Sequence, residues 1–355
     1  MSGELRALTS VRGVAAWLVV LYHIRLSIAG LPEWGLAILA KGYLAVDFFF
    51  LLSGFVIWIS YAPRIRAGGF GVVPEFLRRR VARIWPLHLF MLGFGVMLAL
   101  TMLATGRDAP HFPFGELPLH VLLLQNWGFT NALSWNDPAW SISCELGAYL
   151  LFPLLALAID WRRVPTVAIL AAIGALLVLL HAIFALRDAV SLGDQIPRLG
   201  LIRCILEFAC GTAVAALWLR WRESWKAPAM LSGVLALLLA GAAMLGTVPE
   251  TLAVPAAFAA ALLALALVRG SPLEGRAIHY LGEISYATYL GHYLLWFAFK
   301  LAFVDDAHAV GLPLIALYLA MVLASSALLY HLVERPAQRW INAIPLPSRQ
   351  RKELA

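Results

Sequence analysis

Three titratable side chains lie inside long apolar runs of the sequence and could take part in chemistry: His23, Asp47 and Glu145. An isolated charge inside a membrane is costly, so a titratable group in such a run is a candidate functional residue. A carboxylate that hydrogen-bonds one imidazole nitrogen fixes the tautomer of the ring and raises its basicity. We therefore predict that His23 is catalytic and that Asp47 or Glu145 supports it. Spacing leaves open which carboxylate does so, if either, and whether the three groups form only a structural polar cluster.

The spacing of Arg12 and His23 places both side chains on one face of a helix. They are eleven residues apart, which is close to three full turns, and would lie roughly 16 Å apart along the axis. If Arg12 lies at a membrane surface, His23 lies about halfway through a hydrocarbon core roughly 30 Å thick. An imidazole at that depth indicates a functional group, and a histidine that only hydrogen-bonds within a helical bundle is the alternative.

A second set of candidates is the basic run of residues 76–90, which contains Arg79, Arg80 and Arg83. Arg80 and Arg83 are three residues apart and would share a helix face. Arginines bind phosphate in bidentate fashion, so several at a membrane surface can hold an anion. Arginines in this position also set topology or bind lipid head groups. Arg12, predicted on the same side, favours a phosphate-bearing ligand.

The composition identifies the class of protein. The chain has 355 residues, of which 62% are hydrophobic and only 13% charged, with a mean hydropathy of +0.83. This is typical of a polytopic membrane protein and excludes a water-soluble domain. The net charge of +7 is explained by arginine-rich loops on one side of a bilayer, so we expect no nucleic-acid partner. The three cysteines show no metal-ligand spacing, so we expect no metal site and read them as buried.

The apolar runs predict an all-α transmembrane bundle of about ten spanning helices. Most of the 27 Lys and Arg residues fall in alternate loops, on the same side as both termini, so both termini are predicted to be cytoplasmic. We expect a multi-pass protein of the inner (plasma) membrane. Residues 1–340 would form one membrane-embedded domain and residues 341–355 a short cytoplasmic tail, and the first helix would be retained rather than removed as a signal peptide. The predicted spans are 11–30, 43–61, 86–105, 138–160, 165–186, 199–219, 227–247, 250–268, 283–304 and 311–332.

This topology predicts a common depth for the three titratable groups. His23 would lie about 10 Å from the outer end of its span, Asp47 roughly 6 Å below the outer surface, and Glu145 about 10 Å below it. The prediction is therefore one polar layer in the outer half of the bundle.

Several motifs, in order along nearly the whole chain, resemble those of the acyltransferase-3 family of integral-membrane enzymes. Arg12-Gly13 and His23 resemble the family's arginine, ten residues, histidine pattern. The other matching segments resemble the patterns GVDxFFxLSGF, RRxxRIxP, WSLSxE, RxxxxFxxG, SYxxYLxH and ERP, and they are residues 42–55, 79–86, 138–145, 203–211, 285–292 and 334–336. The departures are Gly291 and His88, where the family often has tryptophan and tyrosine.

The resemblance implies an O-acyltransferase that moves an acyl group, usually acetyl, from cytoplasmic acyl-CoA to a hydroxyl of an extracytoplasmic or lipid-linked glycan. Acetyl-CoA would be a donor substrate, with no permanently bound cofactor. His23 would be the general base or a transient acyl carrier. The nucleotide phosphates would be held by Arg12, Arg79, Arg80 and Arg83. The site would be completed by Trp140, Ser141, Ser143 and Glu145, with His292 as a lesser candidate.

A proton-coupled transporter or flippase for an anionic or lipid-linked substrate is the alternative, because buried carboxylates and a midplane histidine also suit proton coupling. We find neither repeated halves nor matched Gly/Pro-broken helices, which argues against it. A non-catalytic scaffold would not explain why titratable groups share one layer. The acceptor, the size of the acyl group and the oligomeric state are left open.

Overall fold

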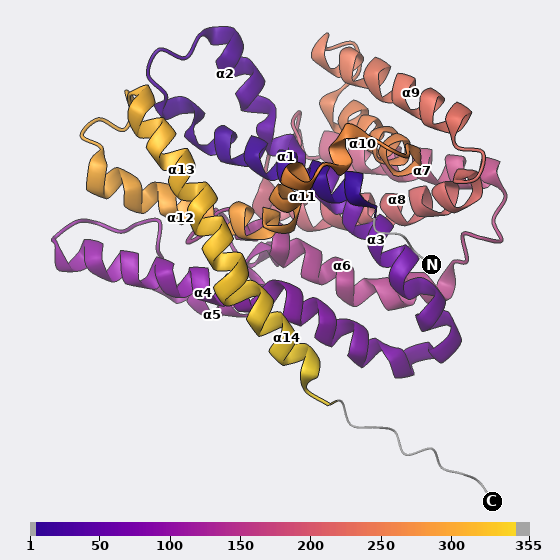
Figure 1. Ribbon diagram of the computed structural model, residues 1–355, viewed down its shortest axis with the longest axis horizontal. Coiled ribbons are helices and arrows are strands. Elements are labelled where there is room, and N and C mark those ends of the chain that lie inside the picture. The colour runs from indigo at the N-terminus through magenta and orange to yellow at the C-terminus, as the bar shows by residue number, and fades with distance from the viewer. Residues whose placement is uncertain (1–4, 346–355) are drawn as a thin grey trace, which may run out of the picture.

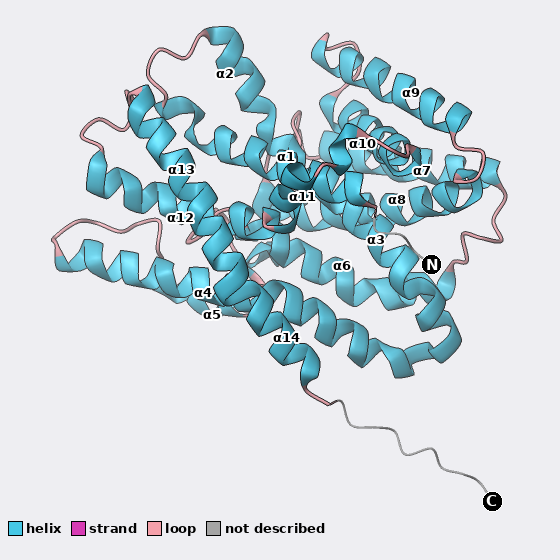
Figure 2. Cartoon of the chain, viewed as in Figure 1, coloured by secondary structure: helices cyan, strands magenta, loops and turns pink. Residues whose placement is uncertain are grey.

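The computed structural model describes residues 5–345, and this part of the chain is a bundle of helices without strands (Figures 1 and 2). The prediction of an all-α fold is confirmed. Ten helices in this part have 18 residues or more: α1 (Arg6–Ile24), α3 (Ala45–Gly68), α4 (Val73–Ala104), α6 (Ala139–Ala158), α7 (Thr166–Ala185), α8 (Ile196–Trp221), α9 (Lys226–Met244), α10 (Glu250–Leu267), α12 (Ser285–Phe303) and α13 (Leu312–Leu329). The shorter helices are α2 (Glu33–Ala40), α5 (Leu117–Val121), α11 (Arg276–Glu283) and α14 (Arg335–Ala343).

Each predicted span coincides with one of the ten long helices. By length and apolar composition, 8 helical stretches of the described chain could cross a membrane, so the protein is a multi-pass membrane protein. One of these stretches, residues 33–104, contains both α3 and α4, and α12 is not among them. The tyrosine, histidine and lysine residues of α12 lower its hydropathy. The count of ten spans and the cytoplasmic position of the termini therefore stay predictions, and residues 346–355 of the predicted tail lie outside the described residues.

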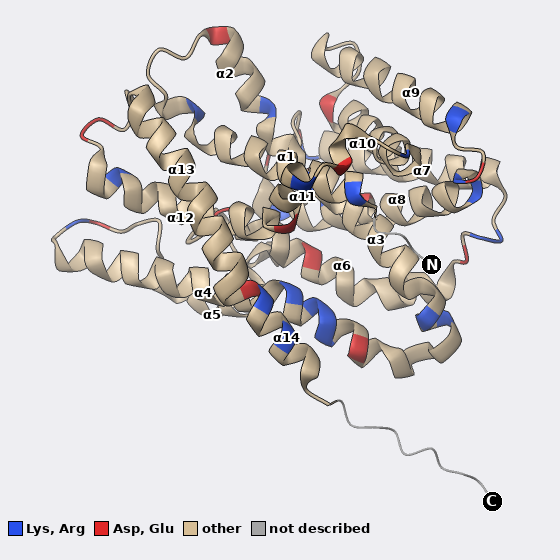
Figure 3. Ribbon diagram, viewed as in Figure 1, with Lys and Arg blue, Asp and Glu red and all other residues tan. Residues whose placement is uncertain are grey.

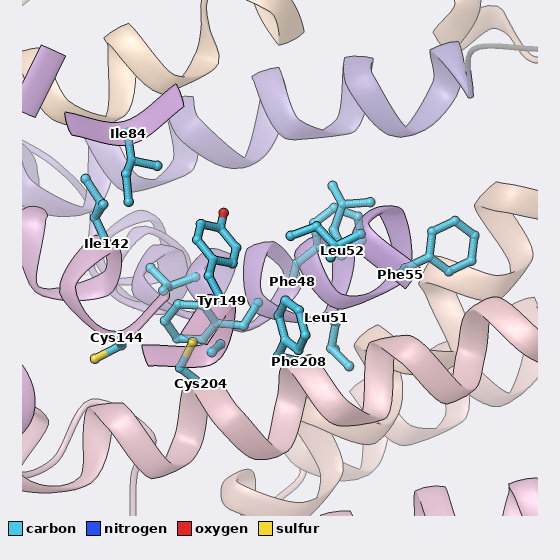
Figure 4. Packing of buried hydrophobic residues seen from close by; sticks show 14 of the residues in the cluster. Phe48, Leu51, Leu52, Phe55, Ile84, Ile142, Cys144, Tyr149, Cys204 and Phe208 are labelled. Carbon is cyan, nitrogen blue, oxygen red and sulfur yellow. The ribbon is translucent and has the colours of Figure 1, made fainter. Parts of the chain in front are cut away.

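The centre of the bundle is formed by α3, α6 and α8. Figure 4 shows Phe208 of α8 beside Leu51 of α3. A side chain at Gly54 would lie 1.9 Å from the Phe208 carbonyl oxygen, and one at Gly211 would lie 1.9 Å from the Leu51 carbonyl oxygen. Both glycines are therefore required for the two backbones to approach, as is common between membrane helices.

The three cysteines lie in this centre and are fully buried and free, as predicted.

The basic run lies on one continuous helix. α4 begins at Val73, well before the predicted start of its span at residue 86, and Pro86 lies inside it. Its basic segment is crossed by α14, and Figure 3 shows Lys and Arg residues gathered at this crossing. The first helix, α1, packs against α11 and α12. These contacts bring the start of α1, the basic part of α4 and the start of α12 together at one end of the molecule.

Candidate active site

A cavity of about 400 Å³ opens between α1, α3, α4, α6 and α12. Its walls are largely apolar, and we call it the arginine cavity because three guanidinium groups share it. Its charged and hydroxyl-bearing lining is Thr9, Arg12, Ser53, Ser60, Arg80, Arg83, Ser141, Glu145, Tyr149, Ser285, Tyr286 and Tyr289. The combination of cationic and apolar walls suits a ligand that is anionic at one end and apolar along its length.

Two of the three arginines in the cavity carry charges that no carboxylate neutralises by direct contact. Arg12 Nη2 donates to Ser285 Oγ at 3.1 Å. The Arg80 guanidinium lies over the rings of Tyr61 and Tyr149, 5.2 and 5.9 Å from their centroids. Throughout residues 5–345, neither arginine forms an ion pair. The cavity can therefore bind a negatively charged group.

The other two predicted phosphate ligands have carboxylate partners. Arg83 lines the cavity, but its Nη1 donates to Glu334, a carboxylate that is only 1% exposed. Arg79 does not line the cavity. It pairs with Glu75 at 2.7 Å and is 42% exposed, because it lies on another face of α4. The geometry therefore favours Arg12 and Arg80 as ligands of an anion. Arg83 faces the cavity but is paired with Glu334, and Arg79 lies outside the cavity.

The structure does not place Glu145 or Asp47 beside His23, in contrast to the predicted polar layer. Glu145 lines the arginine cavity and accepts a hydrogen bond from Ser53. Asp47 is fully buried and forms a bidentate ion pair with Arg203, with both N–O distances at 2.6 Å. His23 lies in the last turn of α1, not seven residues before the end of its helix, and Asp47, in the first turn of α3, pairs with Arg203 instead.

The partner of His23 is His292 of α12. His292 Nδ1 lies 3.0 Å from the Thr288 carbonyl oxygen, so this nitrogen carries the proton of a neutral ring. His292 Nε2 is then an acceptor, and it lies 3.1 Å from His23 Nδ1. His23 Nδ1, also 3.0 Å from the Val19 carbonyl oxygen, must be the protonated nitrogen of its own ring; both tautomers are assigned from these partners. His23 Nε2 thus keeps the lone pair that a general base needs, and no described residue hydrogen-bonds it.

Tyr289, which lines the cavity, also lies beside the histidine pair. Ser141 Oγ and Tyr289 OH are 2.8 Å apart and form the inner end of the cavity. The Tyr289 ring lies 6.4 Å from the His292 ring, centroid to centroid. His23 itself is not among the residues that line the cavity. The cavity therefore has the arginines in its wall and the histidine pair behind Tyr289.

The two remaining predicted site residues support the surrounding structure. Trp140 is buried beneath Arg203, whose guanidinium lies 5.4 Å from the ring. Ser143 Oγ donates to the Leu123 carbonyl oxygen at 2.8 Å. Neither lines the cavity.

Sequence reasoning missed several residues that the fold brings to the site. Ser53 and Tyr149 line the cavity, and His111, Asp137 and Tyr293 lie near His23. Ser53 lies within the segment resembling GVDxFFxLSGF, so that motif could have indicated it. His111 and Asp137 lie between helices, where no spacing rule applies. Within the described chain, no group of three or more His, Cys, Asp or Glu side chains could hold a metal ion.

The sequence of the chain is similar to those of known proteins. A family model described as an acyltransferase domain matches residues 5–331. The chain is 31% identical to the acyltransferase MdmB of Streptomyces mycarofaciens, over 96% of this chain and 93% of that protein. It is 29% identical to the exopolysaccharide production protein ExoZ of Rhizobium meliloti, over 84% of this chain and 90% of that protein. No solved structure matches the chain.

Proposed function

Because the chain belongs to the acyltransferase-3 family, we propose that it transfers an acetyl group from acetyl-CoA to a hydroxyl of an extracytoplasmic or lipid-linked glycan. One observation carries the proposal. The arginine cavity leads from three guanidinium groups to Ser141 and Tyr289, one ring away from a histidine pair that leaves a basic nitrogen free.

The donor would enter with its phosphates at the arginine end. Arg12 and Arg80 would bind the phosphate oxygens, because their charges have no carboxylate partner. The apolar walls suit the pantetheine arm, which would extend toward Ser141 and Tyr289. The hydrogen bond between these two side chains must open for the thioester to reach His23. The excess of Lys and Arg at this end predicts that it faces the cytoplasm, where acetyl-CoA is made.

The transfer itself would use His23 as a general base. His23 Nε2 takes the proton of the acceptor hydroxyl as its oxygen attacks the thioester carbonyl carbon. A carbon–oxygen bond forms and the carbon–sulfur bond breaks. The leaving thiolate takes the proton from the imidazolium, so both the base and coenzyme A end neutral at the reacting atoms. His292 would hold the His23 ring in the required tautomer throughout.

The glycan acceptor is supported by one relative, whose name refers to exopolysaccharide production. The test compares cells with and without the gene, complemented by the wild type or by His23→Ala. We expect acetate released by mild alkali from envelope and secreted glycans to fall without the gene and to return only with the wild type. Unchanged acetate in all strains would refute a glycan acceptor. Transfer by His23→Ala at the wild-type rate would refute the mechanism.

A transporter is separated from an acyltransferase by a second measurement. Purified protein supplied with radiolabelled acetyl-CoA and polysaccharide should give labelled polysaccharide and free coenzyme A in equal amounts. Uptake of label into vesicles without release of coenzyme A would instead favour transport.

A further inference from the structure

Beyond the histidine pair, three polar side chains from separate segments meet. Tyr293 comes from α12, Asp137 immediately precedes the first turn of α6, and His111 lies between α4 and α5. His111 Nε2 is 3.1 Å from Asp137 Oδ1 and 3.4 Å from Tyr293 OH. We call these three residues the outer cluster, and none of them lines the arginine cavity.

The outer cluster is in contact with the proposed base. The Tyr293 ring packs edge-on against the His23 ring, with centroids 5.3 Å apart at 76°. Asp137 and Arg25 are the charged groups that act on His23. The guanidinium of Arg25 lies 3.9 Å from the centroid of the Tyr22 ring. The base therefore has a carboxylate nearby, but that carboxylate is Asp137 and it does not touch the imidazole.

The outer cluster can be reached from outside the protein. The His111 side chain is 25% exposed and the Asp137 side chain 21% exposed, whereas His292 is 1% exposed. Both segments that supply them are predicted to lie outside the membrane, opposite the arginine end. A molecule that arrives from that side would meet the outer cluster before it meets His23.

We propose that the outer cluster is the subsite that holds a neutral, polyhydroxylated acceptor with one hydroxyl beside His23 Nε2. The proposal rests on the proposed function and identifies where its acceptor binds. A carboxylate accepts hydrogen bonds from sugar hydroxyls, an imidazole N–H donates one, and an aromatic ring packs against the apolar face of a sugar. The carboxylate would repel an anionic group at this position, which argues for an uncharged sugar.

The test separates acceptor binding from donor binding in the full-length protein in lipid nanodiscs. Acetyl-CoA is the donor, and the acceptors are methyl glycosides and the de-O-acetylated envelope polysaccharide of the host. Asp137→Asn should raise the KM for acceptor roughly tenfold to a hundredfold, since a hydrogen bond to a charged group is lost. The KM for acetyl-CoA should not change, and Asp137→Glu should recover part of the loss. Asp108→Asn, at an exposed acidic residue in the segment between α4 and α5 that also supplies His111, is the control and should behave as the wild type.

Other results of this test would contradict the subsite or the proposed function. A fall in kcat with an unchanged acceptor KM would overturn the subsite and make Asp137 an electrostatic partner of His23. An unchanged acceptor KM and kcat would overturn it as well, whereas a wild-type protein that acetylates neither kind of sugar would refute the proposed function. If Asp137→Asn does not fold, His111→Gln should give the same selective rise in acceptor KM. Transfer that persists in His23→Ala would refute His23 as the general base, whatever Asp137 does.

Discussion

Replacing Arg12 with glutamine should weaken acetyl-CoA binding without unfolding the protein. The Arg12 guanidinium donates to a neutral hydroxyl, that of Ser285, and has no ion-pair partner in the described chain. Removing its charge therefore leaves no opposite charge buried alone. Glutamine keeps a donor for Ser285. The variant should insert and fold as the wild type does.

The expected loss follows from one charge-assisted hydrogen bond to phosphate. Such a bond contributes about 1.5–3 kcal/mol, and each 1.4 kcal/mol corresponds to about a factor of ten, so the Kd for acetyl-CoA should rise roughly ten- to hundredfold. Turnover at saturating donor should change less, because the phosphates are bound equally in the ground and transition states. The weakening of donor binding by added salt should also be smaller in the variant.

Arg83→Gln is the informative comparison, because Arg83 has a buried carboxylate partner. Its removal leaves Glu334, 1% exposed, without a counter-charge. Breaking one side of a buried pair costs about 3–5 kcal/mol of stability. A second change, Glu334→Gln, should restore the unfolding temperature of Arg83→Gln but should not restore its affinity for acetyl-CoA.

The assay is equilibrium binding of radiolabelled acetyl-CoA to purified protein at low and high salt, beside thermal unfolding of each variant. Wild-type affinity in Arg12→Gln would refute the assignment of the arginine cavity as the donor site. Equal thermal stability of Arg83→Gln and Arg12→Gln would refute the distinction between paired and unpaired arginines.

Three further changes test the rest of the site. His292→Ala removes one of the two acceptors of the His23 Nδ1 proton, so turnover should fall by about tenfold while acetyl-CoA still binds, and unchanged turnover would remove His292 from the mechanism. Asp47→Asn removes the bidentate ion pair with Arg203 and leaves the buried Glu207 as the remaining carboxylate near this arginine, so it should cost at most about 3–5 kcal/mol of stability, measured by thermal unfolding; a variant as stable as the wild type would contradict this ion pair's role. A cysteine placed at Asn131 should react with an impermeant thiol reagent from outside intact cells, and reaction only after lysis would reverse the predicted topology.

The helices could be predicted from the sequence because an apolar run of sufficient length has few alternatives in a membrane. All ten predicted spans coincide with long helices. The boundaries were harder to predict. The apolar run of α1 continues past Ile24, where the helix ends, and α4 extends back through a basic segment that the sequence placed outside the span. Charges and a proline suggested a boundary at residue 86, but the segment is held as helix by its packing against α14.

The candidate site could be predicted only in part, because the sequence did not show where each helix ends. The sequence identified His23, Arg12, Arg80 and Glu145, but their distances from one another depend on where each helix ends. His23 lies in the last turn of α1 and Asp47 in the first turn of α3, but Asp47 is paired with Arg203 and Glu145 lies in the arginine cavity, so neither meets the imidazole. The residues of other helices that do approach its ring, His292 and Tyr293, come from α12, and their contacts depend on the packing of the whole bundle.

The arrangement around His23 can be explained by the cost of buried charge. Asp47, which is fully buried, is balanced by Arg203, and Glu145 lies in a cavity that holds three arginines. A carboxylate in the position of His292, 1% exposed, would need a counter-charge of its own. A neutral imidazole there fixes the same tautomer of His23 at no such cost. The nearest carboxylate, Asp137, instead lies where its side chain is 21% exposed and pairs with His111, and there it can still act on the proton that His23 would accept.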